Sequence, residues 1–331
     1  MTEATLAEYA AVQDAVGLFD FSNRGKIKVI GPDRMTFLHA MVSNDVLELS
    51  DWAGRYGTLL TARGRIIADF FYYKFPDLLL VDIRRDLLAR TLEALQKHII
   101  MDEVEIQDVS LKMQHVSLQG PRTLKLVEEL FGVSAPSNQQ RVRAVQWDQT
   151  KIWLIRKNEL SEYGMELIFP ERITTALRKA LIQRGNPLGL CLIGEEVHNI
   201  LRMEAGIPWY GFDMDENRYP MEAGLKDAIS LTKGCYVGQE VVAKATNIGG
   251  VTNLLMGLKL RENLIPEKGS PVLNEEGQKM GKITSAVFSP RLECPIAFAY
   301  LKRAGVRVGD KYRVKISKDK IVYAEVVDKF V

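Results

Sequence analysis

The chain has 331 residues, of which 47% are hydrophobic and 26% are charged, and its formal net charge is +2. This composition is typical of an ordinary globular protein and excludes a disordered chain, a collagen-like fibre and a small disulfide scaffold. The length predicts roughly two domains of about 150 residues each, and the balanced charge gives no argument for a nucleic-acid or membrane surface as partner.

One pattern of predicted elements occurs twice in the N-terminal half. An alternating strand at residues 26–30 is followed by Gly31-Pro32 and then by a helical set of apolar residues. A strand at 115–119 is followed in the same way by Gly120-Pro121 and a second helical set. Proline is favoured early in a helix because its missing N–H would have been unpaired there. We interpret the two copies as a structural repeat, although a common turn used twice would leave the same pattern.

The other apolar patterns mix strands and helices along the chain. Helices are predicted over 5–16 (stopped by Gly17), 86–99 and 171–184, and strands over 65–74, 78–83, 104–107, 141–147, 151–156 and 165–169. This mixed order predicts an α+β fold with mainly antiparallel sheets. Neither a Gly-x-Gly-x-x-Gly turn after a strand nor a phosphate-binding Gly-x4-Gly-Lys-Ser/Thr loop occurs.

The last part of the sequence changes to short β-rich runs. They cover 254–260, 281–288, 295–301, 311–316 and 321–327, with turn residues between them. Such regular short strands predict a small barrel or sandwich. With a boundary near Gly249-Gly250, we expect an α+β region over 1–248 and a C-terminal β-barrel domain over 249–331.

A first segment with chemical promise runs from Arg202 to Glu216. Glu204 is expected near the end of a helix, followed by a Gly- and Pro-rich loop that contains Tyr210. A carboxylate accepts two parallel N–H bonds, which a flat heterocycle with a ring amide and an amino group can donate. The alternative is that Glu204 pairs with Arg202 or caps a backbone group.

Three cysteines, Cys191, Cys235 and Cys294, are widely spaced and form no Cys-x-x-Cys pair, and the four histidines do not cluster with them. This arrangement predicts a reducing compartment and no cysteine–histidine metal site. The first residues lack the basic and apolar parts of a secretory leader, and no apolar run reaches the length of a membrane span. We therefore expect a cytoplasmic protein without metal ligands.

The second segment with chemical promise surrounds Cys235. Two glycines bracket this cysteine, Lys233 precedes it, and a helix-like run follows. A nearby ammonium and a helix N-terminus both stabilise a thiolate, so the sequence predicts a reactive thiol at Cys235 and small core residues at Cys191 and Cys294. A purely structural cysteine remains the alternative.

Together the two segments resemble the YgfZ/GcvT superfamily over nearly the whole chain. The signature of its YgfZ branch is matched by Lys233, Gly234, Cys235, Tyr236, Gly238, Gln239 and Glu240. Gly17-Leu-Phe-Asp20-x-Ser22 and the run from Gly281 to Pro290 resemble further family motifs. The resemblance implies two interleaved α+β domains and a C-terminal β-barrel around a central opening that holds tetrahydrofolate or a one-carbon derivative of it.

The resemblance also implies roles for individual residues. It implies that folate contacts Glu204, Tyr210, Tyr56, Tyr73 and Asp69. It also implies catalytic roles for Cys235 and Asp69. Glu204 would accept hydrogen bonds from the pteridine ring, and Asp69 would orient or polarise the reacting amine. Without the resemblance, Asp69 is simply a polar residue in a strand.

The sequence also departs from the aminomethyltransferase branch of the superfamily. Asn158 to Gly164 lacks that branch's glycine–tyrosine pair, Asp82 to Asp86 lacks its asparagine, and that branch lacks the cysteine motif. The principal expectation is a tetrahydrofolate-binding protein that supports iron–sulfur cluster assembly or repair, with iron–sulfur proteins or assembly factors as partners. A folate-dependent aminomethyltransferase or related one-carbon transferase, and an interaction protein with a vestigial pocket, stay open.

Overall fold

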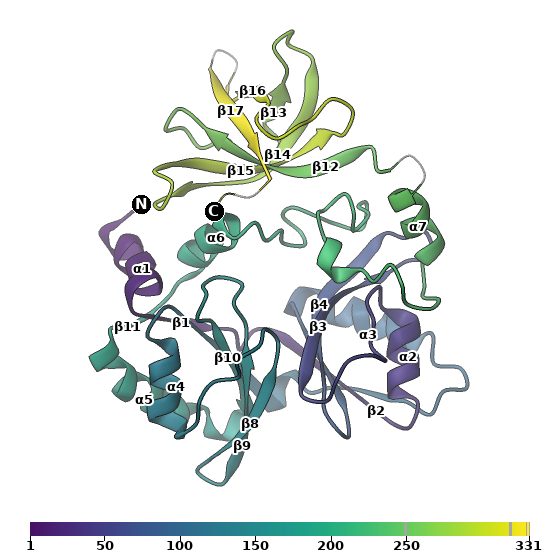
Figure 1. Ribbon diagram of the computed structural model, residues 1–331, viewed down its shortest axis with the longest axis vertical. Coiled ribbons are helices and arrows are strands. Elements are labelled where there is room, and N and C mark those ends of the chain that lie inside the picture. The colour runs from purple at the N-terminus through teal and green to yellow at the C-terminus, as the bar shows by residue number, and fades with distance from the viewer. Residues whose placement is uncertain (248–249, 318–319, 329, 331) are drawn as a thin grey trace. The chain divides into compact units, whose positions relative to one another are not determined.

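The computed structural model describes residues 1–247, 250–317, 320–328 and 330, which form two compact units (Figure 1). Unit 1 comprises 1–59, 67–197 and 227–237, and unit 2 comprises 60–66, 198–226 and 238–331. The chain therefore passes from one unit to the other several times. The unit that holds the C-terminal strands includes earlier segments as well, so the expected division at 248/249 stays a prediction; Gly249 itself lies outside the described residues.

Unit 1 contains a six-stranded sheet in the order β11-β1-β7-β10-β9-β8. These strands are β1 (Val16–Asp20), β7 (Met113–Gln119), β8 (Val142–Trp147), β9 (Thr150–Arg156), β10 (Met165–Pro170) and β11 (Leu190–Leu192). All neighbours are antiparallel except β1 and β11. Helices α4 (Thr123–Phe131) and α5 (Thr174–Gly185) lie side by side against this sheet (Figure 1), where Leu126 and Leu177 join its apolar core.

The second sheet of unit 1 has five strands in the order β3-β4-β5-β2-β6. They are β2 (Gly25–Ile30), β3 (Ala53–Leu60), β4 (Ile66–Lys74), β5 (Leu79–Ile83) and β6 (Glu105–Asp108). Unit 1 also contains α1 (Glu3–Asp14), α2 (Arg34–Met41) and α3 (Leu88–Gln96). Phe71 and Tyr73 of this sheet pack against Ile155 and Ile168 of the other, so the two sheets share a core.

The predicted succession of strand, glycine turn and helix occurs twice, with the same backbone conformation at both glycines, which suits a structural repeat and a recurring turn equally. Gly31, between β2 and α2, has φ +110°, and Gly120, between β7 and α4, has φ +118°. A Cβ atom would lie 2.1 Å from the Glu103 carbonyl oxygen at Gly31 and 2.6 Å from the Ala15 carbonyl oxygen at Gly120. Only glycine fits either turn. The two prolines precede the helices instead of opening them, because α2 begins at Arg34 and α4 at Thr123.

Several local predictions need correction. Gly17 does not stop a helix, because α1 ends at Asp14 and Gly17 lies within β1. Its small size has another reason: a Cβ atom there would lie 2.5 Å from the Val12 side chain. Strands β1, β3, β11 and β13 (Pro271–Leu273) carry no clear two-residue alternation and were missed. Parts of the helices predicted over 86–99 and 171–184 are 3₁₀ turns. The two turns that overlap these predicted helices are Arg85–Leu87 and Glu171–Ile173. Further 3₁₀ turns elsewhere in the described chain occupy Ser110–Lys112, Asn186–Leu188 and Lys226–Ala228.

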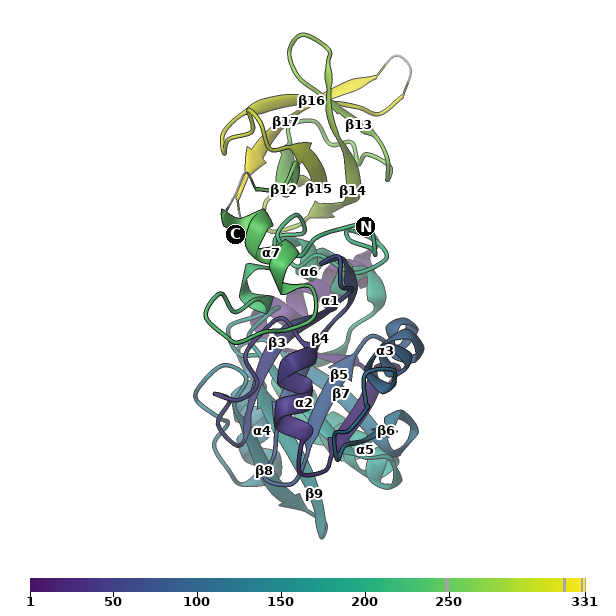
Figure 2. The ribbon, with the colours of Figure 1, turned by 90° about the vertical axis from the view of Figure 1, so that its right-hand side faces the viewer.

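Unit 2 confirms the predicted C-terminal barrel. Six strands close in the order β12-β15-β14-β13-β16-β17 (Figure 2). Besides β13 they are β12 (Asn253–Leu260), β14 (Lys279–Ser289), β15 (Cys294–Lys302), β16 (Lys311–Lys315) and β17 (Ile321–Val327). Helices α6 (Glu195–Glu204) and α7 (Gln239–Asn247) complete the helices of the described residues, and none of these helices has the length and apolarity to cross a bilayer.

Replacing Gly54 by alanine tests how tightly β3 and β4 approach. A Cβ atom at Gly54 would lie 2.4 Å from the ring of Tyr73, which is fully buried. Because the ring cannot move into solvent, we expect the free energy of unfolding to fall by about 1–3 kcal/mol, measured by urea denaturation. Gly194→Ala is the control, since its added methyl group meets only an ordinary contact at 3.4 Å. Equal stability of the two variants would contradict this account of the packing.

Candidate functional site

Asp69 and Tyr56 form the first group of predicted site residues. Asp69 lies on β4 and Tyr56 on β3, and the Tyr56 hydroxyl donates to Asp69 Oδ2 at 2.8 Å. Within the described residues, the other oxygen, Oδ1, is buried and has no hydrogen-bond partner. Burial raises the pKa of Asp69, although the Tyr56 hydrogen bond opposes this shift. An uncommitted buried carboxylate oxygen next to a fixed hydroxyl can accept a proton or a hydrogen bond from a ligand amine.

Tyr73 lies two positions from Phe71 on the Asp69 side of β4, but the structure buries it completely. Its hydroxyl has no hydrogen-bond partner among the described residues. Burial raises the pKa of Tyr73 well above 10.0, and the carboxylates of Glu166 and Asp82 add to the shift. Tyr73 is therefore next to a buried group of charges, and its predicted place as a ligand contact stays a prediction.

That buried group of charges connects the two sheets of unit 1. Asp82 on β5 accepts from Arg24 Nε at 2.9 Å and from Lys26 Nζ at 2.8 Å. His115 on β7 lies between two carboxylates, with Nδ1 3.6 Å from Asp82 Oδ1 and Nε2 3.2 Å from Glu166 Oε2. Lys157 Nζ lies 3.3 Å from Glu166 Oε1. No local sequence pattern indicates this cluster, because its members lie far apart along the chain.

Asp82, His115 and Glu166 have the donor atoms of a metal site, all within 4.8 Å of one another. Their surroundings argue against a cation there. Arg24, Lys26 and Lys157 already compensate the two carboxylates, and a divalent ion would add positive charge to a buried, neutralised group. We therefore assign the cluster to the cohesion of the two sheets.

The cluster makes the stability of the protein sensitive to acid. Burial by itself would raise the carboxyl pKa values, but Arg24 and Lys26 hold the pKa of Asp82 well below 3.8, and Lys157 and His115 lower the pKa of Glu166 to about 2. As the pH falls below about 4.5, the unfolded chain binds these protons before the folded chain does, so the free energy of unfolding should fall. Urea midpoints between about pH 5 and about pH 3 measure the slope, which Glu166→Gln should reduce. An unchanged slope in that variant would contradict the assignment.

The loop over 158–164, where the sequence departs from the aminomethyltransferase pattern, contributes Glu159. Lys157 Nζ lies 3.7 Å from Glu159 Oε2 and 3.6 Å from the centre of the Phe71 ring. The Phe71 ring in turn packs 4.9 Å from the ring of Tyr56. Burial raises the pKa of Glu159, with Lys157 opposing. Glu159 was not predicted as a site residue, and only its position in the departing loop could have indicated it.

Glu204, at the end of α6, belongs to unit 2 and is buried. Its Oε1 accepts a hydrogen bond from the hydroxyl of Ser289, at the end of β14. The C-terminal motif from Gly281 to Pro290 thus has a physical role, because one of its residues fixes the carboxylate of Glu204. Arg202 donates to Asp213, and its alternative pairing with Glu204 stays a prediction.

Arg202 and Asp213 fix the loop that follows α6. Arg202 also donates to the Ile207 carbonyl at 3.1 Å and to Asn199 Oδ1 at 2.8 Å. Tyr210 in this loop is buried, and its hydroxyl lies 3.2 Å from Glu216 Oε2 and 3.4 Å from the Ile66 carbonyl oxygen. Both acceptors belong to the protein, so these contacts give the Tyr210 hydroxyl a structural role. Its predicted contact with a ligand stays a prediction.

Cys235 is exposed, as a reactive thiol requires, but the expected reasons for its reactivity are absent from the described structure. The Lys233 ammonium donates to the carbonyl oxygens of His39, Val42 (2.7 Å) and Asn44 (3.0 Å), which use all three of its protons. The helix begins only at Gln239, so Cys235 is not at its N-terminus. Cys191 and Cys294, predicted as core residues, are half-buried, and burial raises the pKa of each thiol.

The other signature residues serve mostly to shape the chain. Gly238 has φ +84°, and a Cβ atom there would lie 2.6 Å from the Thr61 carbonyl oxygen. Tyr236 is buried, which raises its pKa to about 12. Gln239 opens α7, and Glu240 pairs with Lys244 at 2.7 Å on its exposed surface. At Gly234 the nearest atom to an added Cβ is 3.9 Å away, so packing does not explain that glycine.

Replacing Lys233 by methionine should release the segment that carries Cys235. Burial lowers the pKa of Lys233 to about 8, and its ammonium joins 227–237 to the loop after α2. We expect a loss of about 2–3 kcal/mol in the free energy of unfolding, since hydrogen bonds to a charged donor disappear and buried carbonyls lose their partner. Amide exchange should also quicken at Val237, whose N–H donates to the Ala40 carbonyl. Lys226→Met, on the exposed surface, is the control; equal exchange at Val237 in both variants would contradict the anchoring role.

Comparison with known proteins agrees with the fold. Residues 1–233 match the GCVT N-terminal domain, and residues 253–331 match the glycine cleavage T-protein C-terminal barrel domain. The crystal structure of the glycine cleavage system aminomethyltransferase T from Bartonella henselae is similar to this chain with a TM-score of 0.89 over 99% of this chain and 89% of that one. At 22% sequence identity, this likeness concerns the fold alone.

Curated relatives extend the similarity over the whole chain. An aminomethyltransferase of Prosthecochloris aestuarii is 29% identical over 97% of this chain and 89% of its own length. One of Caldanaerobacter subterraneus subsp. tengcongensis is 29% identical over 99% of this chain and 87% of its own length. The fold is that of an α+β protein with a C-terminal barrel of the T-protein type. The chain belongs to the GcvT/YgfZ superfamily, the family of the glycine cleavage T-protein.

Proposed function

We propose that the chain binds tetrahydrofolate and acts as an aminomethyltransferase or a related one-carbon transferase. The observation that carries the proposal is the half-buried Asp69 side chain, whose Oδ2 accepts from Tyr56 and whose buried Oδ1 has no partner in the described structure. Its surroundings suit a group that must accept a hydrogen bond from an amine inside a water-poor site. The names of the curated relatives support the same activity.

The roles proposed for the two carboxylates differ. Tetrahydrofolate supplies the amine that receives the one-carbon unit, and Asp69 would hold that amine and its proton at Oδ1. Tyr56 fixes the carboxylate so that Oδ1 keeps one orientation. Glu204, held by Ser289, would accept hydrogen bonds from the ring amide and amino group of the pterin. The donor of the one-carbon unit is left open, because the loop over 158–164 differs from that of the aminomethyltransferases.

A second candidate function rests on the exposed cysteine. A YgfZ-type role in iron–sulfur cluster assembly or repair is favoured by the full signature from Lys233 to Glu240 and by the exposure of Cys235 on an anchored segment. One cysteine cannot complete a four-thiolate cluster site, so iron–sulfur proteins or assembly factors would have to supply the other ligands. Cys235 would then act toward a partner, while folate binding would remain in common with the first candidate.

Calorimetric titration with tetrahydrofolate tests the shared premise. We expect saturable binding to the wild-type chain, binding at least tenfold weaker to Glu204→Gln, and unchanged binding to Cys235→Ala. Glu262→Gln, on the barrel surface, provides a matched charge control. Absence of binding to the folded wild-type protein would overturn both candidate functions.

Two further assays separate the candidates. Formation of methylenetetrahydrofolate from an aminomethylated lipoyl carrier, lost in Asp69→Asn and kept in Cys235→Ala, is expected for the transferase. Recovery of iron–sulfur enzyme activity in a deletion strain by Asp69→Asn, but not by Cys235→Ala, would instead favour the second candidate. No turnover with a carrier that an authentic aminomethyltransferase accepts would count against the first.

A further inference from the structure

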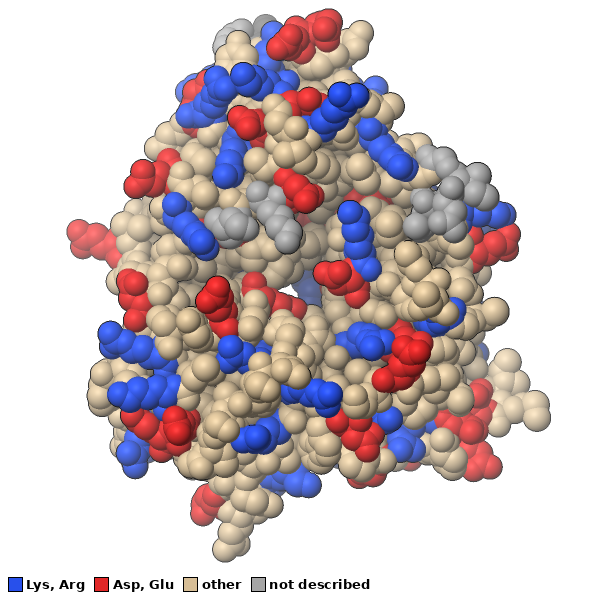
Figure 3. Space-filling view, viewed as in Figure 1, with Lys and Arg blue, Asp and Glu red and all other residues tan. Residues whose placement is uncertain are grey.

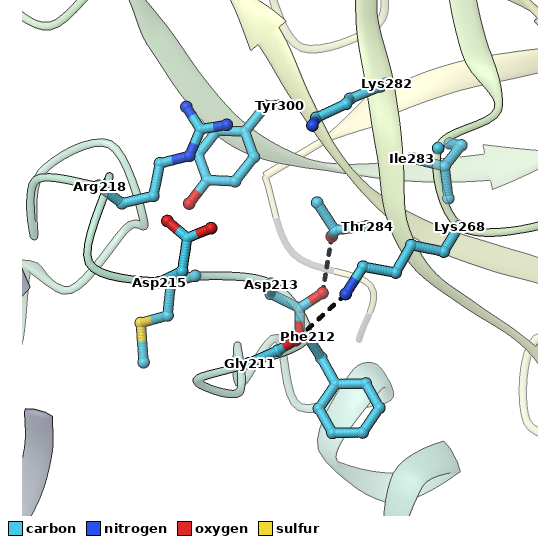
Figure 4. Close-up of a pocket in the computed structure, with 12 residues that line it drawn as sticks. Gly211, Phe212, Asp213, Asp215, Arg218, Lys268, Lys282, Ile283, Thr284 and Tyr300 are labelled. Carbon is cyan, nitrogen blue, oxygen red and sulfur yellow. Dashed lines mark hydrogen bonds between the residues drawn. The ribbon is translucent and has the colours of Figure 1, made fainter. Parts of the chain in front are cut away.

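A second candidate ligand site lies within unit 2, between the loop over 211–218 and the barrel strands (Figure 4). Three positively charged side chains line this pocket: Arg218 from the loop, Lys268 from the turn before β13, and Lys282 from β14. None of the residues assigned to folate lines it. The pocket is therefore a separate feature, and its interpretation does not rest on the proposed function.

The cations are held at the pocket by contacts that leave hydrogen-bond donors available. Lys268 Nζ donates to the Gly211 carbonyl at 3.1 Å, which uses one of its three protons. The Arg218 guanidinium stacks 3.8 Å from the centre of the Tyr300 ring, and this contact uses its face and not its N–H groups. In Figure 4, the Lys282 ammonium extends toward the Tyr300 ring from the opposite side of the pocket to Asp213.

The acidic residues of the pocket do not cancel this positive charge. Asp213 is fully engaged elsewhere: Oδ1 accepts from Thr284 and Ser285, both at 2.6 Å, and Oδ2 accepts from Arg202 and from the Trp209 N–H. Its charge is therefore matched by Arg202. Asp215 remains, and its Oδ1 accepts from the Asn217 N–H at 2.8 Å in the local turn. Three positive side chains thus face one negative side chain, leaving two positive charges.

Tyr300 supplies an independent sign of a ligand. Tyr300 is 4% exposed at the wall of the pocket, and its hydroxyl has no hydrogen-bond partner among the described residues. A buried hydroxyl normally has a partner, and when the protein offers none, a water or ligand does. In Figure 4 the hydroxyl points toward the side of the pocket where Asp215 and Arg218 lie.

The arrangement is local. On the face drawn in Figure 3, blue and red side chains are intermixed over the described residues, as expected for a chain of net charge +2. Three cations line this one pocket. Donors that converge from three segments suit a compact ligand with several acceptor oxygens.

We propose that this pocket of unit 2 is a phosphate-binding site, lined by Arg218, Lys268, Lys282 and Tyr300. A phosphate group carries close to two negative charges at neutral pH and three acceptor oxygens when it is esterified, which match the two unbalanced positive charges and the unused donors. The ligand is either free phosphate or the phosphate of a small monoester, and both present the same dianion to these residues.

Calorimetric titration of the full chain at fixed ionic strength tests the site. The probes are inorganic phosphate, glycerol 3-phosphate and, as a dianion without the tetrahedral shape, malonate. We expect saturable binding of phosphate or of the monoester, with malonate at least tenfold weaker. The tighter of the first two probes identifies the source. Non-saturable heats for both phosphates, or malonate binding as tight as either, would overturn the proposal.

Three variants connect binding to the named residues. Lys268→Gln/Lys282→Gln should weaken phosphate at least tenfold, and Tyr300→Phe at least threefold. The control Lys302→Gln/Lys311→Gln removes the same charge from exposed barrel positions outside the pocket and should bind as wild type. If the control variant lost as much phosphate affinity as Lys268→Gln/Lys282→Gln, the loss would follow from net charge alone, and the proposed site would be overturned.

A tetrahydrofolate titration of the double variant separates this site from the proposed function. Unchanged tetrahydrofolate affinity together with lost phosphate affinity supports two independent sites. The opposite result has two parts: the wild-type chain binds no phosphate, and the double variant loses affinity for tetrahydrofolate. That result would assign the cations to folate binding and overturn the phosphate site.

Discussion

Replacing Asp82 by asparagine is expected to lower the free energy of unfolding by about 3–5 kcal/mol, because it breaks a buried ion cluster from its centre. Asp82 is fully buried and lies within 3 Å of both Arg24 and Lys26. Without its charge, Lys26, which is 1% exposed and whose pKa burial already lowers, must either lose its proton or stay charged without its carboxylate partner, and both cost stability. Urea denaturation at neutral pH measures the loss.

A nearby exposed pair provides the control for that result. Asp86 pairs with Arg84 at 2.9 Å, but its side chain is 56% exposed. Because solvent screens such a pair, Asp86→Asn should cost less than about 1 kcal/mol. A second variant, Asp82→Asn with Lys26→Met, should recover part of the loss by removing the orphaned cation. Equal stability of Asp82→Asn and Asp86→Asn would show that the cluster contributes no cohesion.

Replacing Asp69 by asparagine is expected to lower kcat by about 10²- to 10⁴-fold if the chain is a one-carbon transferase. An amide can still receive the Tyr56 hydrogen bond, so the packing of β3 and β4 is kept. It cannot hold a proton from the reacting amine, so the loss falls on kcat, and the KM for tetrahydrofolate changes little. Steady-state kinetics with the carrier substrate, together with urea denaturation, separates this loss from unfolding.

Tyr56→Phe is the matched comparison for Asp69. It leaves the carboxylate but removes the hydroxyl that orients it. We expect a smaller fall in kcat and, because the hydrogen bond opposes the effect of burial, a further rise in the pKa of Asp69. The acid limb of the pH–rate profile should move to higher pH in this variant. Wild-type kcat in Asp69→Asn would exclude Asp69 from the chemistry.

The two Gly-Pro turns and a C-terminal barrel or sandwich could be predicted because each is a local pattern, and the family resemblance favoured the barrel. Gly31 and Gly120 both follow a strand and precede a helix, and the structure gives them nearly the same positive φ. Most barrel strands are short β-rich runs separated by turn residues, and β16 and β17 also alternate between buried and more exposed positions. Patterns of this kind can be recognised from neighbouring residues alone, without knowledge of the tertiary contacts.

The ion cluster could not be predicted, for the opposite reason. Arg24, Asp82, His115 and Glu166 lie 33 or more residues apart, and each resembles an ordinary polar position of a strand until the two sheets are brought together. Lys233 shows the same limit, since its partners lie 189 to 194 residues away along the chain. Its position beside Cys235 suggested an electrostatic partner for a thiol, whereas the three carbonyls that hold it come from 39–44.

For the proposed ligand residues, the sequence predicted chemistry better than geometry. Asp69 and Tyr56 were both predicted, and the structure joins them by a hydrogen bond. The role of Ser289 in fixing Glu204 was not predicted, because a serine 85 residues away gives no local signal. Neither Glu159 nor Tyr300 could be identified from spacing, since only the folded chain shows what surrounds them.

The order of segments in unit 1 has a consequence for how the protein is made. Its last segment, 227–237, is hydrogen-bonded to the loop after α2 through Ser43, Asn44 and Lys233. A ribosome must therefore release more than two-thirds of the chain before unit 1 can fold completely. Residues 60–66 and 198–226 belong to unit 2, so they cannot pack fully until the barrel strands have been synthesised. An unfinished chain spends this interval with open sheet edges, which are prone to association. The nascent protein should thus depend more on chaperones than one whose domains emerge from the ribosome one after the other.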